Sequence, residues 1–258
     1  MRIIDLSISI EDGLPCDPQP QIPHIKYLNH KDTAETMVSY FQQKICTEDL
    51  PDGNGWAIEH LELTTHSGTH VDAPYHYYPT MNGNDRAWTI DEVPLDWFIG
   101  NGVVLDFRDK ADGYRIMPED LVICLDRYGY KLKPGDIPLI CTGADRFWGT
   151  ETYLTKGAGM SAAATRFLID QGIRVMGIDA WSWDVPLPLE AEEFSRNKDT
   201  SMLWEAHRVG RERAYCHIEK LTNLDLLPFT GFQVICLPVK IKGASAGWCR
   251  CIAVLKNE

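Results

Sequence analysis

The residues best suited to chemistry lie in one short stretch, His66-Ser-Gly-Thr-His70-Val-Asp72-Ala-Pro-Tyr-His76. Three imidazoles and a carboxylate fall within these eleven residues, and no other segment is as dense in such groups. Neutral imidazole and carboxylate are the usual nitrogen and oxygen ligands of zinc and similar divalent metals. The same side chains move protons near neutral pH. The stretch therefore predicts a metal site that also carries a proton-transfer group.

The chemistry expected of such a site follows from the number of metal-binding side chains in this stretch. A carboxylate can bridge two metal ions because it has two oxygens and a negative charge, and a metal lowers the pKa of bound water towards about 7. The stretch offers more groups than one metal ion needs, so one histidine is left free as general base and acid. A lone histidine is more often only hydrogen-bonded, but four groups at this density favour a metal site.

The local sequence predicts that the stretch is not helical. Gly68 and Thr69 are poor helix formers, and Pro74 pushes Ala73 out of the helical region. The spacing of the first two histidines is therefore not that of a helical HExxH pair. We expect these residues at the end of a strand over 56–65 and in the loop that follows it, where functional groups commonly lie.

The elements that must position the stretch are predicted from periodicity and turn residues. Residues 11–35, rich in Pro, Asp and Gln, predict an irregular arm. Strands outnumber helices and alternate with them only in the middle third, which predicts a single α/β domain over 1–258 with a mixed sheet. The expected strands are 3–10, 36–45, 56–65, 102–107, 137–142, 175–178, 214–221, 233–241 and 250–255; the expected helices are 117–126, 161–171 capped by Ser161, and 202–213, with a Pro- and Glu-rich loop after residue 186.

Composition excludes several partners. The net charge of −12 over 258 residues argues against nucleic acid and anionic membranes, which attract basic surfaces. The N-terminus lacks the features of a signal peptide and no apolar window spans a membrane, so a cytoplasmic protein is the expectation. None of the eight cysteines forms a CxxC pair, so we expect buried free thiols and no cysteine zinc site.

The pattern HxGTHxDxPxH resembles the signature of the cyclase family of metal-dependent hydrolases, which includes bacterial-type kynurenine formamidases and isatin hydrolases. Every fixed position of that signature is present between His66 and His76. The resemblance continues through residues 142–186, 207–228 and 238–248, whereas residues 1–55 match weakly. It implies the swivelling β/β/α fold of the family and a homo-oligomer, a dimer or tetramer, in which the N-terminal arm reaches a neighbour.

The resemblance also implies roles for individual residues. His76 would be the catalytic proton-transfer residue. A carboxylate at position 219 favours two zinc ions, with one manganese ion as the alternative, since relatives that resemble isatin hydrolase tend to have a neutral amide there. The implied metal ligands are His66, His70 and Asp72 for the first ion, and Asp72, His207 and Glu219 for the second.

The expected activity is hydrolysis of a small amide, formamide, lactam or lactone, and the nearest named activity is that of an arylformamidase. The alternatives are a lactone hydrolase, a cyclase or dehydratase acting on a polyketide-like substrate, and a non-catalytic metal-binding or sensor protein. The stretch Leu14-Pro-Cys-Asp-Pro18 has no tryptophan where compact formamidases have a Trp-Pro segment.

Other polar and aromatic residues are predicted to be structural. Asp179 and Asp184 are expected to be acceptors in a turn. Packing is the expected role of Trp148, Trp181 and Trp183, with stacking on a substrate as the alternative. The remaining histidines have no partner pattern and are expected to be structural or exposed: His24, His30, His60 and His217.

Overall fold

A nine-stranded mixed sheet organises the body of the molecule, and its strand order is β1-β15-β13-β7-β9-β11-β12-β4-β14. The computed structural model describes residues 1–19 and 21–255. Strands β7, β9, β11 and β12 are parallel, and the strands on either side of them pair antiparallel. The strands are β1 (Arg2–Asp5), β4 (His70–Asp72), β7 (Ile99–Asp106), β9 (Ile137–Cys141), β11 (Val175–Ile178), β12 (Cys216–Glu219), β13 (Phe232–Ile235), β14 (Ala246–Trp248) and β15 (Ile252–Leu255).

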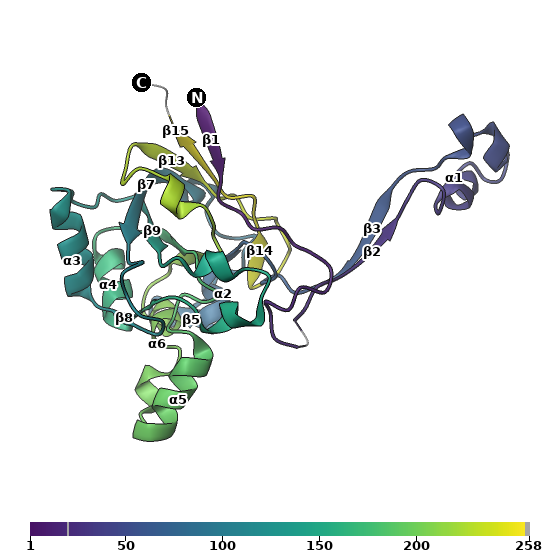
Figure 1. The fold of residues 1–258 in the computed structure, drawn as a ribbon. Coiled ribbons are helices and arrows are strands. Elements are labelled where there is room, and N and C mark those ends of the chain that lie inside the picture. The colour runs from purple at the N-terminus through teal and green to yellow at the C-terminus, as the bar shows by residue number, and fades with distance from the viewer. Residues whose placement is uncertain (20, 256–258) are drawn as a thin grey trace.

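Helices α3 (Pro118–Arg127) and α4 (Ala162–Asp170) pack side by side on one face of this sheet (Figure 1). Helix α4 begins as predicted, because Ser161 Oγ accepts a hydrogen bond from the backbone N–H of Ala164 at 3.0 Å. The opposite face buries a second apolar cluster that includes Val71 and Ile218. The predicted single α/β domain with a mixed sheet is confirmed. Within the described residues, no helix has the length and apolar character that a membrane span requires.

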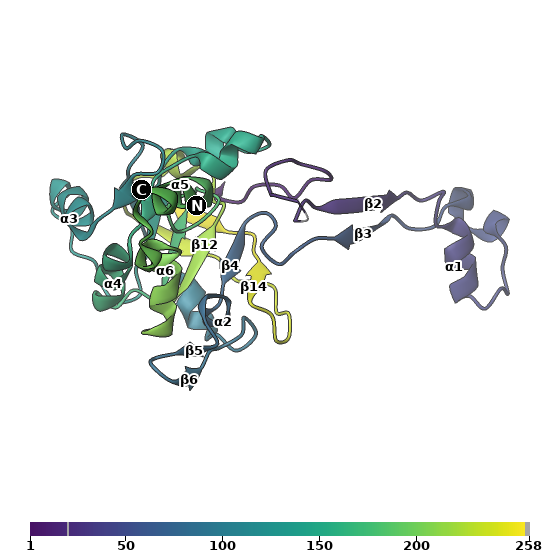
Figure 2. The same ribbon diagram turned by 90° about the horizontal axis from the view of Figure 1, so that it is seen from below.

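A long arm projects from the body (Figures 1 and 2). Its two-stranded ribbon pairs β2 (His24–Leu28) with β3 (Ile58–Glu62), and helix α1 (Ala34–Tyr40) lies at its tip. The prediction of a strand over 36–45 is therefore wrong. Ala34 and Val38, one helical turn apart, pack with Leu50 in a small apolar cluster, and this burial stabilises a helix there. The irregular segment predicted over 11–35 likewise contains β2 and the start of α1.

Three further expectations near the site are corrected. Residues 74–77 form a one-turn helix, α2 (Pro74–Tyr77), because proline is well suited to the first helical position. The loop expected after residue 186 contains helix α5 (Leu187–Asn197), which also has proline in its first turn. The helix expected over 202–213 is reduced to α6 (Glu205–Arg208) with short 3₁₀ turns on either side.

The remaining elements are short. Two small sheets pair β8 (Arg115–Ile116) with β10 (Gly159–Met160) and β5 (Thr80–Met81) with β6 (Asp85–Arg86). The 3₁₀ turns are Thr47–Asp49, Pro51–Gly53, Leu95–Phe98, Ala144–Phe147, Glu151–Thr155, Thr200–Met202, Val209–Arg211 and Leu224–Leu226.

Candidate metal centre

Strands β4 and β12 bring four of the polar side chains together. In their antiparallel register Asp72 lies opposite His217, and His70 lies opposite Glu219. Residues two apart on a strand point to the same face, and directly opposite residues are neighbours across the ladder. The four side chains therefore form a square on one face of the sheet, while Val71 and Ile218 point into the apolar cluster on the other face.

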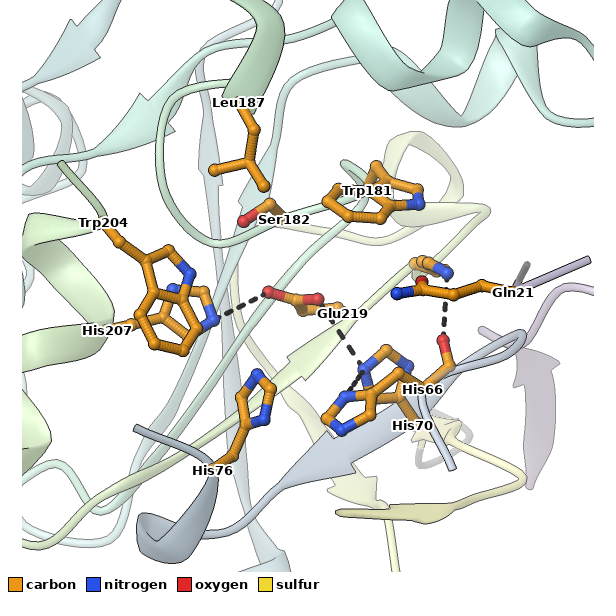
Figure 3. A pocket seen from close by; sticks show the side chains of 11 residues that line it. Gln21, His66, His70, His76, Trp181, Ser182, Leu187, Trp204, His207 and Glu219 are labelled. Carbon is orange, nitrogen blue, oxygen red and sulfur yellow. Dashed lines mark hydrogen bonds and ion pairs between the residues drawn. The ribbon is translucent and has the colours of Figure 1, made fainter. Parts of the chain in front are cut away.

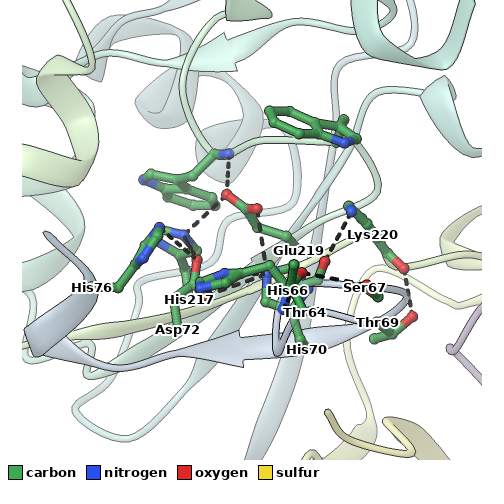
Figure 4. A network of polar contacts seen from close by, with 12 residues as sticks. Thr64, His66, Ser67, Thr69, His70, Asp72, His76, His217, Glu219 and Lys220 are labelled. Carbon is green, nitrogen blue, oxygen red and sulfur yellow. Dashed lines mark hydrogen bonds and ion pairs between the residues drawn. The ribbon is translucent and has the colours of Figure 1, made fainter. Parts of the chain in front are cut away.

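One side of this square is completed by the turn that precedes β4. His66 Nδ1 lies 2.9 Å from Asp72 Oδ1 and 3.2 Å from His70 Nε2 (Figure 4). His70 Nε2 lies 3.3 Å from Asp72 Oδ1 and 3.6 Å from Glu219 Oε2. Tetrahedral zinc with bonds of about 2.0 to 2.1 Å needs neighbouring ligand atoms about 3.4 Å apart. The spacing on this side is therefore that of a metal-ligand set.

The other side of the square is completed by helices α2 and α6. His217 Nε2 lies 3.0 Å from Asp72 Oδ2 and 3.1 Å from Glu219 Oε1. His207 Nε2 lies 3.4 Å from Glu219 Oε1 and 4.0 Å from Asp72 Oδ2. His76 Nε2 lies 3.9 Å from Asp72 Oδ2. Each of the two carboxylates thus presents one oxygen to each side, the arrangement needed to bridge two cations.

Most of the imidazoles are oriented by a contact at the ring nitrogen that faces away from the centre. Such partners fix the tautomer and leave the other nitrogen with a lone pair for a metal. The contacts are His66 Nε2 with Ser245 Oγ at 3.2 Å, His70 Nδ1 with the carbonyl of Gly68 at 2.8 Å, His207 Nδ1 with Asp184 Oδ2, and His217 Nδ1 with the hydroxyl of Tyr77 at 3.2 Å.

The environment of Asp72 tests whether a cation fits. Both of its carboxylate oxygens are fully buried and receive no hydrogen bond. A buried carboxylate that receives no hydrogen bond is strongly unfavourable, even with imidazole nitrogens about it, and Glu219 adds a second carboxylate to the same cluster. Divalent cations compensate two such charges, and the surrounding imidazole nitrogens are suitable additional ligands. The cluster therefore fits bound metal.

The charges of the cluster shift two histidines in opposite directions. Burial opposes the charged form of His207, but its contacts with Asp184 and Glu219 prevail and raise its pKa to about 10. Burial lowers the pKa of His76 to about 3, and this outweighs the attraction of Asp72. At neutral pH in the metal-free protein, the His207 ring therefore carries two protons and a positive charge, whereas the His76 ring is neutral.

Metal binding is consequently expected to release protons. His207 must lose its second proton to become a ligand, so metal affinity should rise as the pH rises towards its pKa of about 10. The slope should be about tenfold in affinity per pH unit for each proton released. Calorimetric titration with Zn²⁺ in buffers of different ionisation enthalpy measures that proton. A pH-independent affinity between about pH 6 and 9, with no proton released, would contradict this picture.

A cavity of about 180 Å³ opens above the cluster. Figure 3 shows Trp181 and Trp204 on its two sides, with Leu187 and Ser182 opposite the metal-type ligands. The Trp204 ring stacks on His207 with centroids 4.4 Å apart, and His76 meets it edge-on at 5.3 Å. The cavity therefore places a small molecule in reach of the cluster and of His76.

The structure brings together every site residue predicted from the sequence: His66, His70, Asp72, His76, His207 and Glu219. Their individual roles stay predictions. His217 is buried inside the cluster, so the expectation that it is merely structural or exposed missed a metal-type group. Its position two residues before Glu219 on a strand was the available signal. Asp184 is confirmed as an acceptor, and it holds the His207 ring and the backbone of α6.

The fold and the cluster define an α/β protein with a buried metal-type centre at the floor of a small cavity. The chain belongs to the cyclase family, since the family model described as "Putative cyclase" matches residues 4–185. It is 28% identical to a kynurenine formamidase of Erythrobacter litoralis over 258 aligned residues, covering 97% of this chain and 93% of the relative.

Solved structures share the fold. An isatin hydrolase bound to the product analogue thioisatinate superposes with a TM-score of 0.77 at 19% identity, covering 99% of this chain and 92% of that one. Isatin hydrolase A of Labrenzia aggregata, bound to benzyl benzoate, gives a TM-score of 0.75 at 23% identity, with 99% and 94% covered.

Proposed function

We propose that this protein is a metal-dependent hydrolase that cleaves a small-molecule amide, formamide, lactam or lactone. The main support for this proposal is the buried cluster of imidazoles and carboxylates at the floor of a cavity sized for a small molecule. Membership of the cyclase family and the likeness to a kynurenine formamidase support an activity on carbon–nitrogen bonds. The nearest named activity is that of an arylformamidase, with a lactone hydrolase as the alternative.

The proposed ligands are those of the two sides of the cluster. His66, His70 and Asp72 hold one divalent ion, and Asp72, His207 and Glu219 hold a second, with His217 positioned to join them. We propose that the site binds two zinc ions, and a single manganese ion is the alternative. Divalent ions of this kind lower the pKa of water and polarise a substrate carbonyl.

His76 is the proposed proton carrier. Its ring lines the cavity, is a quarter exposed, and stays neutral at pH 7 because burial lowers its pKa to about 3. A neutral imidazole accepts a proton from the attacking water and then delivers it to the leaving group. Trp204 limits the movement of the ring, since it meets His76 edge-on at 5.3 Å. The backbone N–H of Trp183 donates to Glu219 Oε1 at 2.7 Å and holds that carboxylate in place.

The test combines metal analysis with a screen of N-formylkynurenine, isatin, small lactones and cyclic amides. We expect bound metal, turnover of at least one substrate, loss of turnover with a chelator and recovery with Zn²⁺ or Mn²⁺. Reaction in ¹⁸O-labelled water should place one solvent oxygen in the product. A product without that oxygen would favour a cyclase or dehydratase, and metal-loaded protein without any turnover would favour a binding protein.

We also propose that the protein is a homo-oligomer that covers the arm. Ile25, Tyr27 and Leu61 share one face of the β2–β3 ribbon with Glu59, and Tyr27 and Leu61 are 62% and 55% exposed. A two-stranded ribbon alone is marginally stable, so these exposed apolar side chains favour burial against another surface. A second copy of the chain is the proposed partner, in a dimer or tetramer.

Light scattering on the native protein should therefore give the mass of a dimer or tetramer. Replacing Tyr27 and Leu61 together by glutamate should shift the mass towards that of a monomer, because two charges would be buried unpaired. The matched control replaces Lys26 and His60, which lie opposite each other on the other face of the ribbon, and should leave the mass unchanged. A wild-type monomer at micromolar concentration would refute this part of the proposal.

A further inference from the structure

A buried ion pair lies at the wall of the cavity, outside the proposed ligand set. Lys220 and Asp17 are 1% and 4% exposed, although they are 203 residues apart in the chain. Lys220 Nζ donates to Asp17 Oδ1. It also donates, at 2.9 Å, to the backbone carbonyl of His66 (Figure 4). The ammonium thus joins the N-terminal segment, the end of β12 and the turn that carries a proposed ligand.

The same carboxylate oxygen also holds an aromatic side chain. Trp181 Nε1 donates to Asp17 Oδ1 at 2.8 Å, and Lys220 Nζ lies 5.3 Å from the centre of the Trp181 ring. Trp181 forms one side of the cavity, opposite Trp204 (Figure 3). Its orientation is therefore set by a charged pair that is almost completely buried.

The backbone of Lys220 shows that this placement is specific. On a regular strand the residue after Glu219 would point to the opposite face of the sheet. Lys220 instead has φ of +58°, in the left-handed region that non-glycine residues seldom adopt and that is concentrated at functional sites. This conformation lets Lys220 line the same cavity as Glu219.

A buried ion pair is a poor source of stability, because desolvation of both charges offsets their attraction. A role in positioning a neighbouring side chain explains this pair better, because Asp17 also binds Trp181 in the cavity wall. We propose that Lys220 and Asp17 are positioning residues that fix the Trp181 indole as the surface on which the flat part of a substrate rests. The substrate side of this inference rests on the proposed hydrolase function; the positioning of Trp181 does not.

The first test observes Trp181 directly, without a substrate. The chain has eight tryptophans, and protein labelled with 5-fluorotryptophan gives a ¹⁹F resonance for Trp181 that Trp181→Phe identifies by its disappearance. Asp17→Asn keeps the size of the side chain and removes its charge, while Lys220→Met removes the ammonium. We expect each variant, and the double variant in which no buried charge is left unpaired, to shift or broaden the Trp181 resonance.

The matched control is Asp112→Asn, which removes the partner of Lys156 in a more exposed pair of 2.8 Å. That variant should leave the Trp181 resonance unchanged. An unchanged resonance in both Asp17→Asn and the folded double variant would overturn the positioning role.

The second test uses steady-state kinetics to separate an effect on substrate binding from an effect on turnover. For an aryl formamide we expect Asp17→Asn to raise KM about tenfold with kcat within about threefold of wild type, and for the small aliphatic N-methylformamide we expect both constants to be unchanged. Equal losses on both substrates would indicate general damage and overturn the specificity role. If the wild-type protein hydrolyses no amide, formamide, lactam or lactone, the proposed function fails, while the ¹⁹F spectra still decide whether the pair positions Trp181.

Discussion

Replacing Asp72 by asparagine is expected to remove bound metal and to reduce turnover by at least about a thousandfold, because one substitution disturbs both sides of the cluster. Oδ1 of Asp72 faces His66 and His70, and Oδ2 faces His217. The amide keeps the volume of the carboxylate but has no charge, and only one of its two terminal atoms can coordinate a metal. Metal content after dialysis and turnover of the substrate found in the screen measure the effect.

Thermal unfolding gives an independent readout of the same substitution. A metal present at about a thousand times its dissociation constant stabilises the native state by about 4 kcal/mol, so Zn²⁺ should raise the Tm of the wild-type protein. That increase should vanish in Asp72→Asn. Asp179→Asn is the matched control, since Asp179 is equally buried but accepts hydrogen bonds from Thr142 and Gly143. It should lower stability without removing metal. Full metal content in Asp72→Asn would refute the bridging role.

The part of the site that the sequence predicts is the part that is local in the chain. His66, His70, Asp72 and His76 are close in sequence, and turns of glycine and proline keep them close in space. The central strands and helix α4 were also predictable, because continuous apolar runs and a serine cap are local signals. His207 and Glu219 needed the resemblance to the cyclase family, since no local pattern links them to the motif.

The spacing of His217 from Glu219 shows that the two share a strand face, but its contact with Asp72 depends on strand register. Its pairing with Asp72 joins residues 145 positions apart, and only the folded sheet places them opposite each other.

The prediction of a strand in place of helix α1 fails for a related reason. Its sequence is short and mixed, and contact with Leu50 at the tip of the arm decides its conformation. Helix α5 was hidden by its prolines, which favour a loop in sequence but are well tolerated in a first helical turn.

Replacing His76 by alanine is expected to lower kcat by about 10²- to 10⁴-fold while metal content stays at the wild-type level. Two readings of His76 compete. Its Nε2 lies within reach of Asp72 and His66, so it belongs to a group that could hold a metal ion. However, its distance to Asp72 Oδ2 is 3.9 Å, longer than the corresponding 2.9 Å of His66 Nδ1 to Oδ1. Its ring nitrogens also lack the orienting partner that the other four imidazoles have among the described residues.

Metal analysis of His76→Ala separates these readings. Retained metal with lost turnover supports proton transfer, whereas lost metal makes His76 a ligand, and near-wild-type turnover removes it from the mechanism. His60→Ala is the matched control, because His60 is exposed on the arm and contacts no cluster residue. Added imidazole should partly restore turnover to His76→Ala, since the deleted ring lines the cavity and leaves a space of its own shape. Rescue should grow with the neutral fraction of the added imidazole, because a neutral ring is what the pKa of about 3 assigns to His76 at neutral pH.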